Sequence, residues 1–165
     1  MFKNAIVCGI AIVISIIAGC ESDSGSVRSA ISDFEKYKTY HPAKVVLLPI
    51  SEVQKADKAN KADMIIAYVQ LQDAAGAAMK GPGVFRFELY RYQARAADPK
   101  GKRMYIWDDI NLMNFIDNSE QWRDYLRAYE FKLDYYCPDC ERYVLEVTCT
   151  SPWGQRYLSS VVLER

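Results

Sequence analysis

The sequence is poor in histidine and has no excess of charge of either sign. Its single histidine is His41, and its 21 basic side chains are balanced by 21 acidic ones. Nucleic-acid binding depends on a basic surface that releases counterions, so this balance argues against a nucleic-acid partner. It also argues against a polybasic grip on lipid headgroups. Because His41 precedes a proline and has no serine, cysteine or aspartate arranged for a proton relay, we expect a surface residue there and not a catalytic base.

Motifs for metals and cofactors are also missing. The glycines around Pro82 lack the Lys-Ser/Thr and the helix that complete a phosphate-binding loop. Asp108, Asp109 and Asp117 could offer oxygen ligands to calcium, but their spacing matches no EF-hand, so we interpret them as solvated loop residues. No repeat of solenoid or propeller period is present. We therefore predict no metal, no cofactor and no catalytic residue, which indicates a non-enzymatic protein.

The longest apolar run, from Ala5 to Ala18, is too short to cross a membrane. A bilayer core of about 30 Å needs about 20 apolar residues in a helix, and this run is interrupted by a cysteine, a glycine and a serine. It follows a positive charge at Lys3 and ends in small residues, which is typical of a signal peptide. The alternatives are a secretory signal that leaves a soluble protein, and a spanning helix.

The end of that run, Ile17-Ala18-Gly19-Cys20, resembles the lipobox of bacterial lipoproteins. The resemblance implies that residues 1–19 are removed and that Cys20 receives a diacylglyceryl group and often a further acyl chain. Two or three chains together give stable anchoring where one does not. The residue after Cys20 is Glu21 and not an aspartate, which resembles lipoproteins exported to the outer membrane. We therefore expect a protein anchored in the bacterial cell envelope, on the periplasmic side of the outer membrane.

The remaining 146 residues are enough for one domain with a real core. Residues 20–43 are predicted to form the lipidated cysteine and a tether, because residues 21–26 are polar and contain serine and glycine. A short helix from Val27 to Phe34 is possible, because its apolar residues follow helical spacing. The domain itself is predicted to span residues 44–165.

Alternation of apolar and polar residues predicts that this domain is all-β. Period-two patterns mark strands with one buried face, and Pro49 indicates an edge strand or a break in the first of them. We expect residues 108–119 to be irregular and residues 120–127 to form a helical turn. Without βαβ alternation, the pattern predicts an antiparallel two-layer β-sandwich with Ig-like or prealbumin-like topology. The expected strands, about seven, are 44–50, 64–72, 84–92, 104–107, 129–135, 143–150 and 156–163.

Three segments of the domain resemble envelope lipoproteins that carry one small β-rich domain after a lipobox. They are PGVFRFELYRY (82–92), PKGKR (99–103) and WRDYLRAYEFKLDY (122–135). The resemblance covers most of the chain after the signal peptide and supports the β-sandwich prediction. It implies no biochemical mechanism.

Two cysteines, Cys137 and Cys140, enclose Pro-Asp between two predicted strands. That sequence suits a type I turn whose ends lie close enough for a disulfide, so we predict a staple at a hairpin tip. The alternative is a thiol-disulfide redox site, because C-P-x-C resembles the glutaredoxin motif, although the residues that follow favour a strand and not a helix. Zinc would have only Cys149 and His41 to add, so a four-ligand site is not expected. Cys149 is interpreted as a buried apolar residue, or as the partner of one of the pair.

Aromatic residues supply the candidates for partner binding. Tyrosine and tryptophan dominate binding hot spots, although such rings also complete sandwich cores and corners. We therefore predict a lipid-anchored module that holds a protein, a peptide or a glycan of the envelope, with a peptide along a sheet edge as one route. A carbohydrate-binding module would require Trp107 and Trp122 to be exposed side by side. The chosen candidates are Tyr90, Tyr92, Trp107 and Trp122, from a set that also includes Tyr68, Tyr125 and Tyr129.

Overall fold

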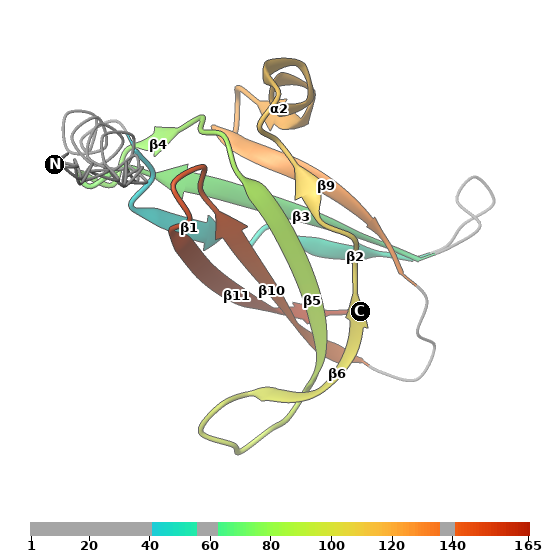
Figure 1. Ribbon diagram of the computed structural model, residues 1–165. Helices are drawn as coiled ribbons and strands as arrows, with labels where there is room; N and C mark the ends of the chain where they lie inside the picture. Colours follow the sequence, from blue (N-terminus) through green and yellow to red (C-terminus); the bar gives the residue numbers. More distant parts are fainter. Residues whose placement is uncertain (1–40, 56–62, 136–140) are drawn as a thin grey trace, which may run out of the picture.

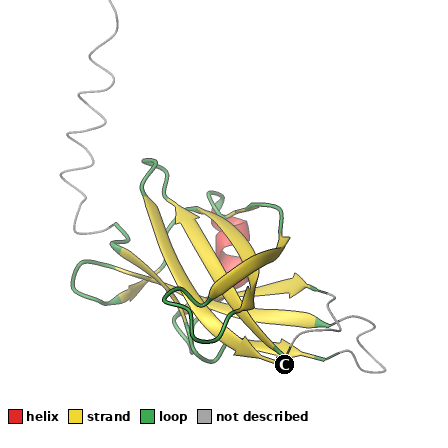
Figure 2. Cartoon of the chain, turned by 90° about the horizontal axis from the view of Figure 1, so that it is seen from below, coloured by secondary structure: helices red, strands yellow, loops and turns green. Residues whose placement is uncertain are grey.

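The computed structural model describes residues 41–55, 63–135 and 141–165. They form two antiparallel sheets and one short helix, α2 (Phe115–Gln121), at one end of the molecule (Figure 1). Figure 2, viewed from below, shows the helix behind the strands. The first sheet contains β1 (Lys44–Leu47), β2 (Glu52–Gln54), β3 (Met64–Gln72), β4 (Ala78–Met79), β8 (Trp122–Arg123) and β9 (Ala128–Asp134). The second contains β5 (Val84–Tyr92), β6 (Lys100–Ile106), β7 (Ile110–Asn111), β10 (Arg142–Thr150) and β11 (Arg156–Glu164).

The order of the long strands is that of an Ig-like sandwich. The first sheet runs β1-β3-β9, with β2 and β4 also paired to β3 and β8 paired to β9. The second runs β11-β10-β5-β6, with β7 also paired to β5. In Ig nomenclature the seven long strands are A-B-E in one sheet and G-F-C-C′ in the other. The predicted all-β antiparallel sandwich is therefore confirmed, and of the two predicted topologies the chain has the Ig-like one.

The core lies between the two sheets and uses the residues that alternation placed inside. Ile65 of β3 and Phe85 and Phe87 of β5 are fully buried. The sheets meet through aromatic rings: the centroid of Phe131 on β9 lies 5.2 Å from that of Phe85 and 4.9 Å from that of Phe87. Burying each such side chain contributes about 1.5–3 kcal/mol. The seven predicted strands correspond to β1, β3, β5, β6, β9, β10 and β11.

The predicted break at Pro49 is confirmed. β1 and β2 are two parts of one edge, both paired with β3, and residues 48–51 interrupt it. The Ser51 hydroxyl repairs the ladder: it accepts the Tyr68 N–H at 3.0 Å and donates to the Leu48 carbonyl at 2.8 Å. A side-chain oxygen thus replaces the backbone partner that the break removes from β3.

The prediction for residues 108–127 was wrong except at its end, where residues 124–127 form a turn in which the Arg127 N–H donates to the Asp124 carbonyl. The helix begins at Phe115, before the expected helical turn, and residues 122–123 are strand β8. The reason is the Asn114 cap, whose side chain accepts the Ile116 N–H at 2.8 Å and satisfies one of the free N–H groups of the first turn. Strands β2, β4 and β7 were also not predicted, because runs of two or three residues carry no period.

Several predictions concern residues outside the described ranges. They are the lipidated Cys20, the tether with its possible helix at residues 27–34, and the Cys137–Cys140 pair. Within the described ranges, no helix has the length and apolar character needed to cross a membrane.

Candidate functional site

The edge of β9 that faces away from β3 is the main unpaired feature of the first sheet. β3 covers one side of β9 from Tyr129 to Asp134. On the other side β8 pairs only with Ala128 and Tyr129. In other Ig-like sheets a D strand lies beside the E strand, and here β8 takes that place with two residues. Among the described residues, no strand therefore lies beside Glu130–Asp134 on this side.

The backbone groups on this edge can be assigned from the ladder. The Tyr135 N–H donates to the Asp63 carbonyl at 3.0 Å, on the β3 side. Because successive residues of a strand direct their backbone groups to opposite sides, those of Glu130, Lys132 and Asp134 face the open edge. The Asp134 carbonyl accepts the Trp107 indole N–H at 2.8 Å, which agrees with this assignment. Lys132 thus presents an N–H and a carbonyl in the orientation that a further strand would use.

A groove lies beside this edge, with a cavity volume of about 350 Å³. Its polar wall is held by Arg123, which bonds Glu130 at 3.2 Å and the Glu120 carbonyl at 2.7 Å. The Lys132 side chain is exposed, and no carboxylate of the described residues pairs with it. The groove thus combines apolar contact, a fixed ion pair and one available cation. Its lining residues are Ile110, Glu120, Gln121, Arg123, Glu130, Phe131 and Lys132.

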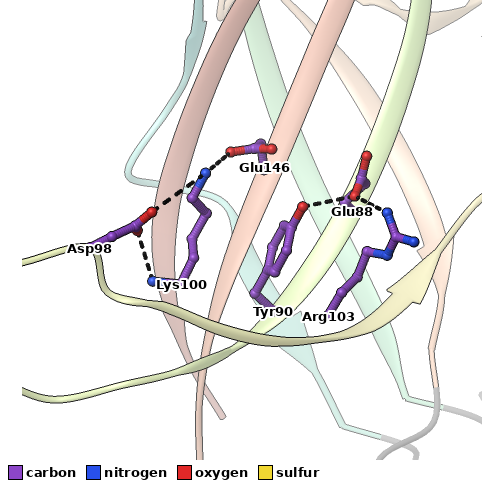
Figure 3. Close-up of polar contacts among 6 residues, drawn as sticks. All are labelled: Glu88, Tyr90, Asp98, Lys100, Arg103 and Glu146. Atoms are coloured by element: carbon purple, nitrogen blue, oxygen red, sulfur yellow. Dashed lines mark hydrogen bonds and ion pairs between the residues drawn. The ribbon is translucent and has the colours of Figure 1, made fainter. Parts of the chain in front are cut away.

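Tyr90 lies elsewhere, on the outer face of the second sheet, in a polar network (Figure 3). Its hydroxyl donates to Glu88 at 2.8 Å, and the Lys100 ammonium lies 5.6 Å from its ring centroid. Burial, followed by the bond to Glu88, raises the pKa of Tyr90 to about 12. Tyr92, two residues on, has the Arg142 guanidinium 5.3 Å from its ring centroid. Both tyrosines are already engaged within the domain.

The same network contains two carboxylates on adjacent strands, Glu88 and Glu146, in direct register. Like charges placed opposite each other destabilise a sheet, and here each has its own cation: Arg103 at 2.9 Å from Glu88, and Lys100 at 2.8 Å from Glu146. Burial disfavours ionisation of Glu88, but the bonds from Tyr90 and Arg103 outweigh it and lower its pKa. Glu88 is therefore ionised at neutral pH and has no proton to donate as a general acid.

Trp107 and Trp122 do not form a common surface. Both are half-buried and packed against the core. Trp107 lies near Tyr135, with centroids 6.3 Å apart, and Trp122 lies near Tyr129, with centroids 5.1 Å apart. Tyr129 and Tyr135 are six residues, or about 20 Å, apart on one extended segment, so the two indoles pack against opposite ends of it. The side-by-side arrangement that a glycan-binding face needs is absent.

The burial of three further residues can be compared with its prediction. Tyr129, which was included among the outward aromatics, is fully buried. Its hydroxyl can be buried because it accepts the Gly81 N–H at 2.9 Å. His41, expected at the surface, is buried against Trp153, with ring centroids 3.7 Å apart. Cys149 is a free, buried thiol, as its apolar interpretation requires. No disulfide is present within the described ranges, and Cys137 and Cys140 lie outside them.

The aspartates considered for calcium do not gather into a site. Asp109 is paired with Arg86 at 2.7 Å, and this hydrogen bond lowers the pKa of Asp109. The described part of the chain contains no group of acidic, histidine or cysteine side chains that could hold a metal ion.

The β9 edge was not predicted, because it depends on how few residues of β8 pair with β9, and two residues leave no periodic signal.

Comparison with family models, curated proteins and solved structures finds no match to this chain.

Proposed function

We propose that this chain is a non-enzymatic binding module of the bacterial cell envelope, anchored by lipid at Cys20 on the periplasmic side of the outer membrane. In this proposal the partner is an extended peptide or protein segment that adds a strand to the free edge of β9. The observation that carries it is the unpaired backbone of Lys132 beside a groove of about 350 Å³. Strand addition draws affinity from main-chain hydrogen bonds and specificity from the groove at alternate side chains.

The other sheet edges are less suited to this role. β6 carries Lys100, Lys102 and Arg103 and pairs irregularly with β5, and both features protect an edge against pairing. β11 lies against β1, where the Ser159 hydroxyl accepts the Leu47 N–H at 3.0 Å. The β1–β2 edge is interrupted between its two strands. Within the described ranges, β9 offers the edge with fewest obstacles.

The groove also suggests the chemistry of the partner. Lys132 is exposed without a partner carboxylate in the described chain, so we expect an acidic side chain opposite it. Ile110 and Phe131 also line the groove, so we expect apolar residues on the other face of the added strand. The expected ligand is a segment in which acidic and apolar residues alternate.

The test uses a phage-displayed library of random linear peptides selected against the full chain, with two variants of Lys132. K132P removes the edge N–H but leaves the ladder to β3 intact, because this N–H faces the open side. K132A removes only the side chain. We expect selected peptides to bind K132A with a few-fold loss and K132P with a loss of about tenfold or more.

A second measurement guards against a misfolded K132P. Hydrogen exchange of the Lys132 amide in the unaltered chain should slow when a selected peptide is added, because the amide then enters a ladder. Equal binding to K132P and the unaltered chain, an unprotected Lys132 amide, or a library without binders would each refute the edge as the site.

The anchor is tested separately. C20S should release the protein from the membrane fraction, and mass spectrometry of the N-terminal peptide should find the acyl groups on Cys20 in the unaltered chain. The redox alternative is tested by thiol titration with and without denaturant. A Cys137 thiol that is alkylated at acidic pH would favour a thiol-disulfide factor over a binding module.

A further inference from the structure

One end of the sandwich carries a concentration of exposed apolar side chains. Of the ten exposed large apolar side chains in the described ranges, five lie in α2 or in loops at the end marked by α2. Phe115 and Ile116, in the first turn of α2, are 81% and 62% exposed. We call the five residues the apolar end: Met113, Phe115, Ile116, Tyr125 and Trp153.

Buried hydrogen bonds hold the helix that carries Phe115 and Ile116. A cavity of about 300 Å³ is lined by Met113 and Phe115 together with Gly81 and Asn118. The buried Asn118 amide donates to the carbonyls of Gly81 and Leu112 at 3.0 and 3.1 Å. Because the amide fixes both connections to the helix, the exposed position of Phe115 is built into the fold.

The described chain begins at the same end. Pro42 packs against Gly81: a Cβ placed on that glycine would lie 3.0 Å from the Pro42 ring. His41, the first described residue, packs against Trp153, with ring centroids 3.7 Å apart. Figure 1 shows α2, β4, the β10–β11 turn and the start of the described chain at one end. The segment that leads back to Cys20 therefore leaves the domain beside the apolar end.

We infer that the apolar end contacts the acyl-chain boundary of the bilayer that holds the lipid anchor, so that the domain rests on the membrane in one orientation. This inference rests on the anchor in the proposed function. The 20 residues between Cys20 and His41 span at most about 70 Å, so the apolar end stays within that distance of the anchor. Tethering makes the second contact intramolecular, with an effective concentration in the ~mM range, so a weak apolar contact suffices.

The side chains suit this boundary. Phenylalanine and isoleucine insert readily into it, and tryptophan is enriched there because one end of the ring is apolar and the other polar. Charges at the rim are mixed, with Lys80 and Asp117 both exposed. Contact should therefore depend on apolar insertion and vary little with the fraction of anionic lipid.

The orientation also serves the proposed binding site. Residues 130–134 of β9 lead away from the apolar end, since β9 begins beside α2 and the Tyr129 hydroxyl bonds Asn118 at 2.9 Å. Resting on the apolar end would leave the open β9 edge accessible from the periplasm.

The test places a tryptophan at the apolar end of the full lipidated chain, reconstituted in vesicles of phosphatidylethanolamine and phosphatidylglycerol with brominated acyl chains. The matched control is V162W, because Val162 is also an exposed apolar residue. It lies six positions, or about 20 Å, along β11 from the start of that strand, which is near the apolar end. We expect the fluorescence added by F115W to be quenched several-fold more than that added by V162W. Lowering the fraction of phosphatidylglycerol should change this difference little.

Equal quenching of F115W and V162W overturns the inference. A shift in F115W emission that follows the surface density of protein without quenching also overturns it, because a second copy then covers the apolar end. Mass spectrometry of the same sample separates the two proposals. An acylated Cys20 with unquenched F115W refutes only the membrane contact, whereas an unmodified Cys20 refutes the anchor and, with it, this inference.

Discussion

At the scale of single residues, Cys149 illustrates how burial changes chemistry. Its thiol is buried on β10 and lies where a Cβ on Gly83 would come within 2.9 Å, so only glycine fits at that position of the neighbouring loop. Burial raises the pKa of Cys149 from 9.0 to about 12. A thiol so far from ionisation is inert at neutral pH, and Cys149 is a packing residue.

This shift predicts a loss of stability in alkaline solution. The unfolded thiol ionises near pH 9 while the folded thiol stays protonated to about pH 12. The folded state therefore binds the extra proton, and stability falls as pH rises through this window, by up to about 1.4 kcal/mol per pH unit. Urea unfolding between about pH 8 and about pH 11 measures it.

C149A is the control for that measurement. It removes the titrating thiol, so its stability should fall less steeply over the same window, although its stability at neutral pH is lower because of the small cavity. Equal slopes for C149A and the unaltered chain would show that Cys149 does not cause the alkaline loss.

Single-residue predictions from the sequence succeeded where alternation alone decides burial. Ile65 and Phe87 were placed in the core because every second residue of a half-buried strand points inward, and both are fully buried. The pairing of Glu88 with Arg103 depends on strand register across a bulge, which no local pattern specifies. His41 was misplaced because its burial comes from Trp153, which is distant in the sequence.

At the scale of elements, one buried network joins α2 to the sheets. The Tyr129 hydroxyl accepts the Gly81 N–H at 2.9 Å and lies 2.9 Å from the Asn118 amide oxygen and 3.1 Å from the Gly81 carbonyl. Burial raises the pKa of Tyr129. A strand, a loop and a seven-residue helix thus share one hydroxyl. A helix of this length is not stable alone and depends on such contacts.

We predict that Y129F destabilises the fold by about 1–3 kcal/mol, because the Gly81 N–H loses its buried acceptor. Urea denaturation measures the loss, and hydrogen exchange should show that amides of α2 open more often than those of β5. The control is Y157F, since the half-buried Tyr157 hydroxyl bonds only Gln155 among the described contacts, at 2.6 Å. If Y157F were as costly as Y129F, the network would have no special role.

The predictability of elements followed their length. The seven long strands carry enough period-two positions to be recognised, whereas β4 and β8 contain two residues each. The Asn114 cap was a usable sign of α2, since asparagine before an acidic first turn favours a helix start, but residues 108–119 were expected to be irregular. The candidate edge on β9 was not predicted either, because it depends on the shortness of β8.

At the scale of the whole molecule, the sandwich is closed by contacts that join its two sheets. Leu47 and Ser159 bridge β1 and β11 at one side. The Arg165 guanidinium, after β11 of the second sheet, bonds the Asp63 carboxylate at 2.6 Å, just before β3 of the first. The side chain of Asp63 is only 6% exposed. Removing the cation of such a pair costs more than breaking a surface pair, because the nearly buried carboxylate then has little water to solvate it.

We expect R165A to lower the free energy of unfolding by about 1.5–3 kcal/mol, because it removes a charge-assisted hydrogen bond from a nearly buried carboxylate. The matched control is R142A. Arg142 pairs with Glu164, the residue before Arg165, and lies over the Tyr92 ring. Both charged side chains are largely exposed, so water and salt replace the ion pair and the loss should be clearly smaller. Urea unfolding at low and high salt measures both variants. The loss in R165A should persist at high salt, since a buried pair is poorly screened, whereas any loss in R142A should disappear. Equal losses would mean that the Arg165 bridge behaves as a surface pair.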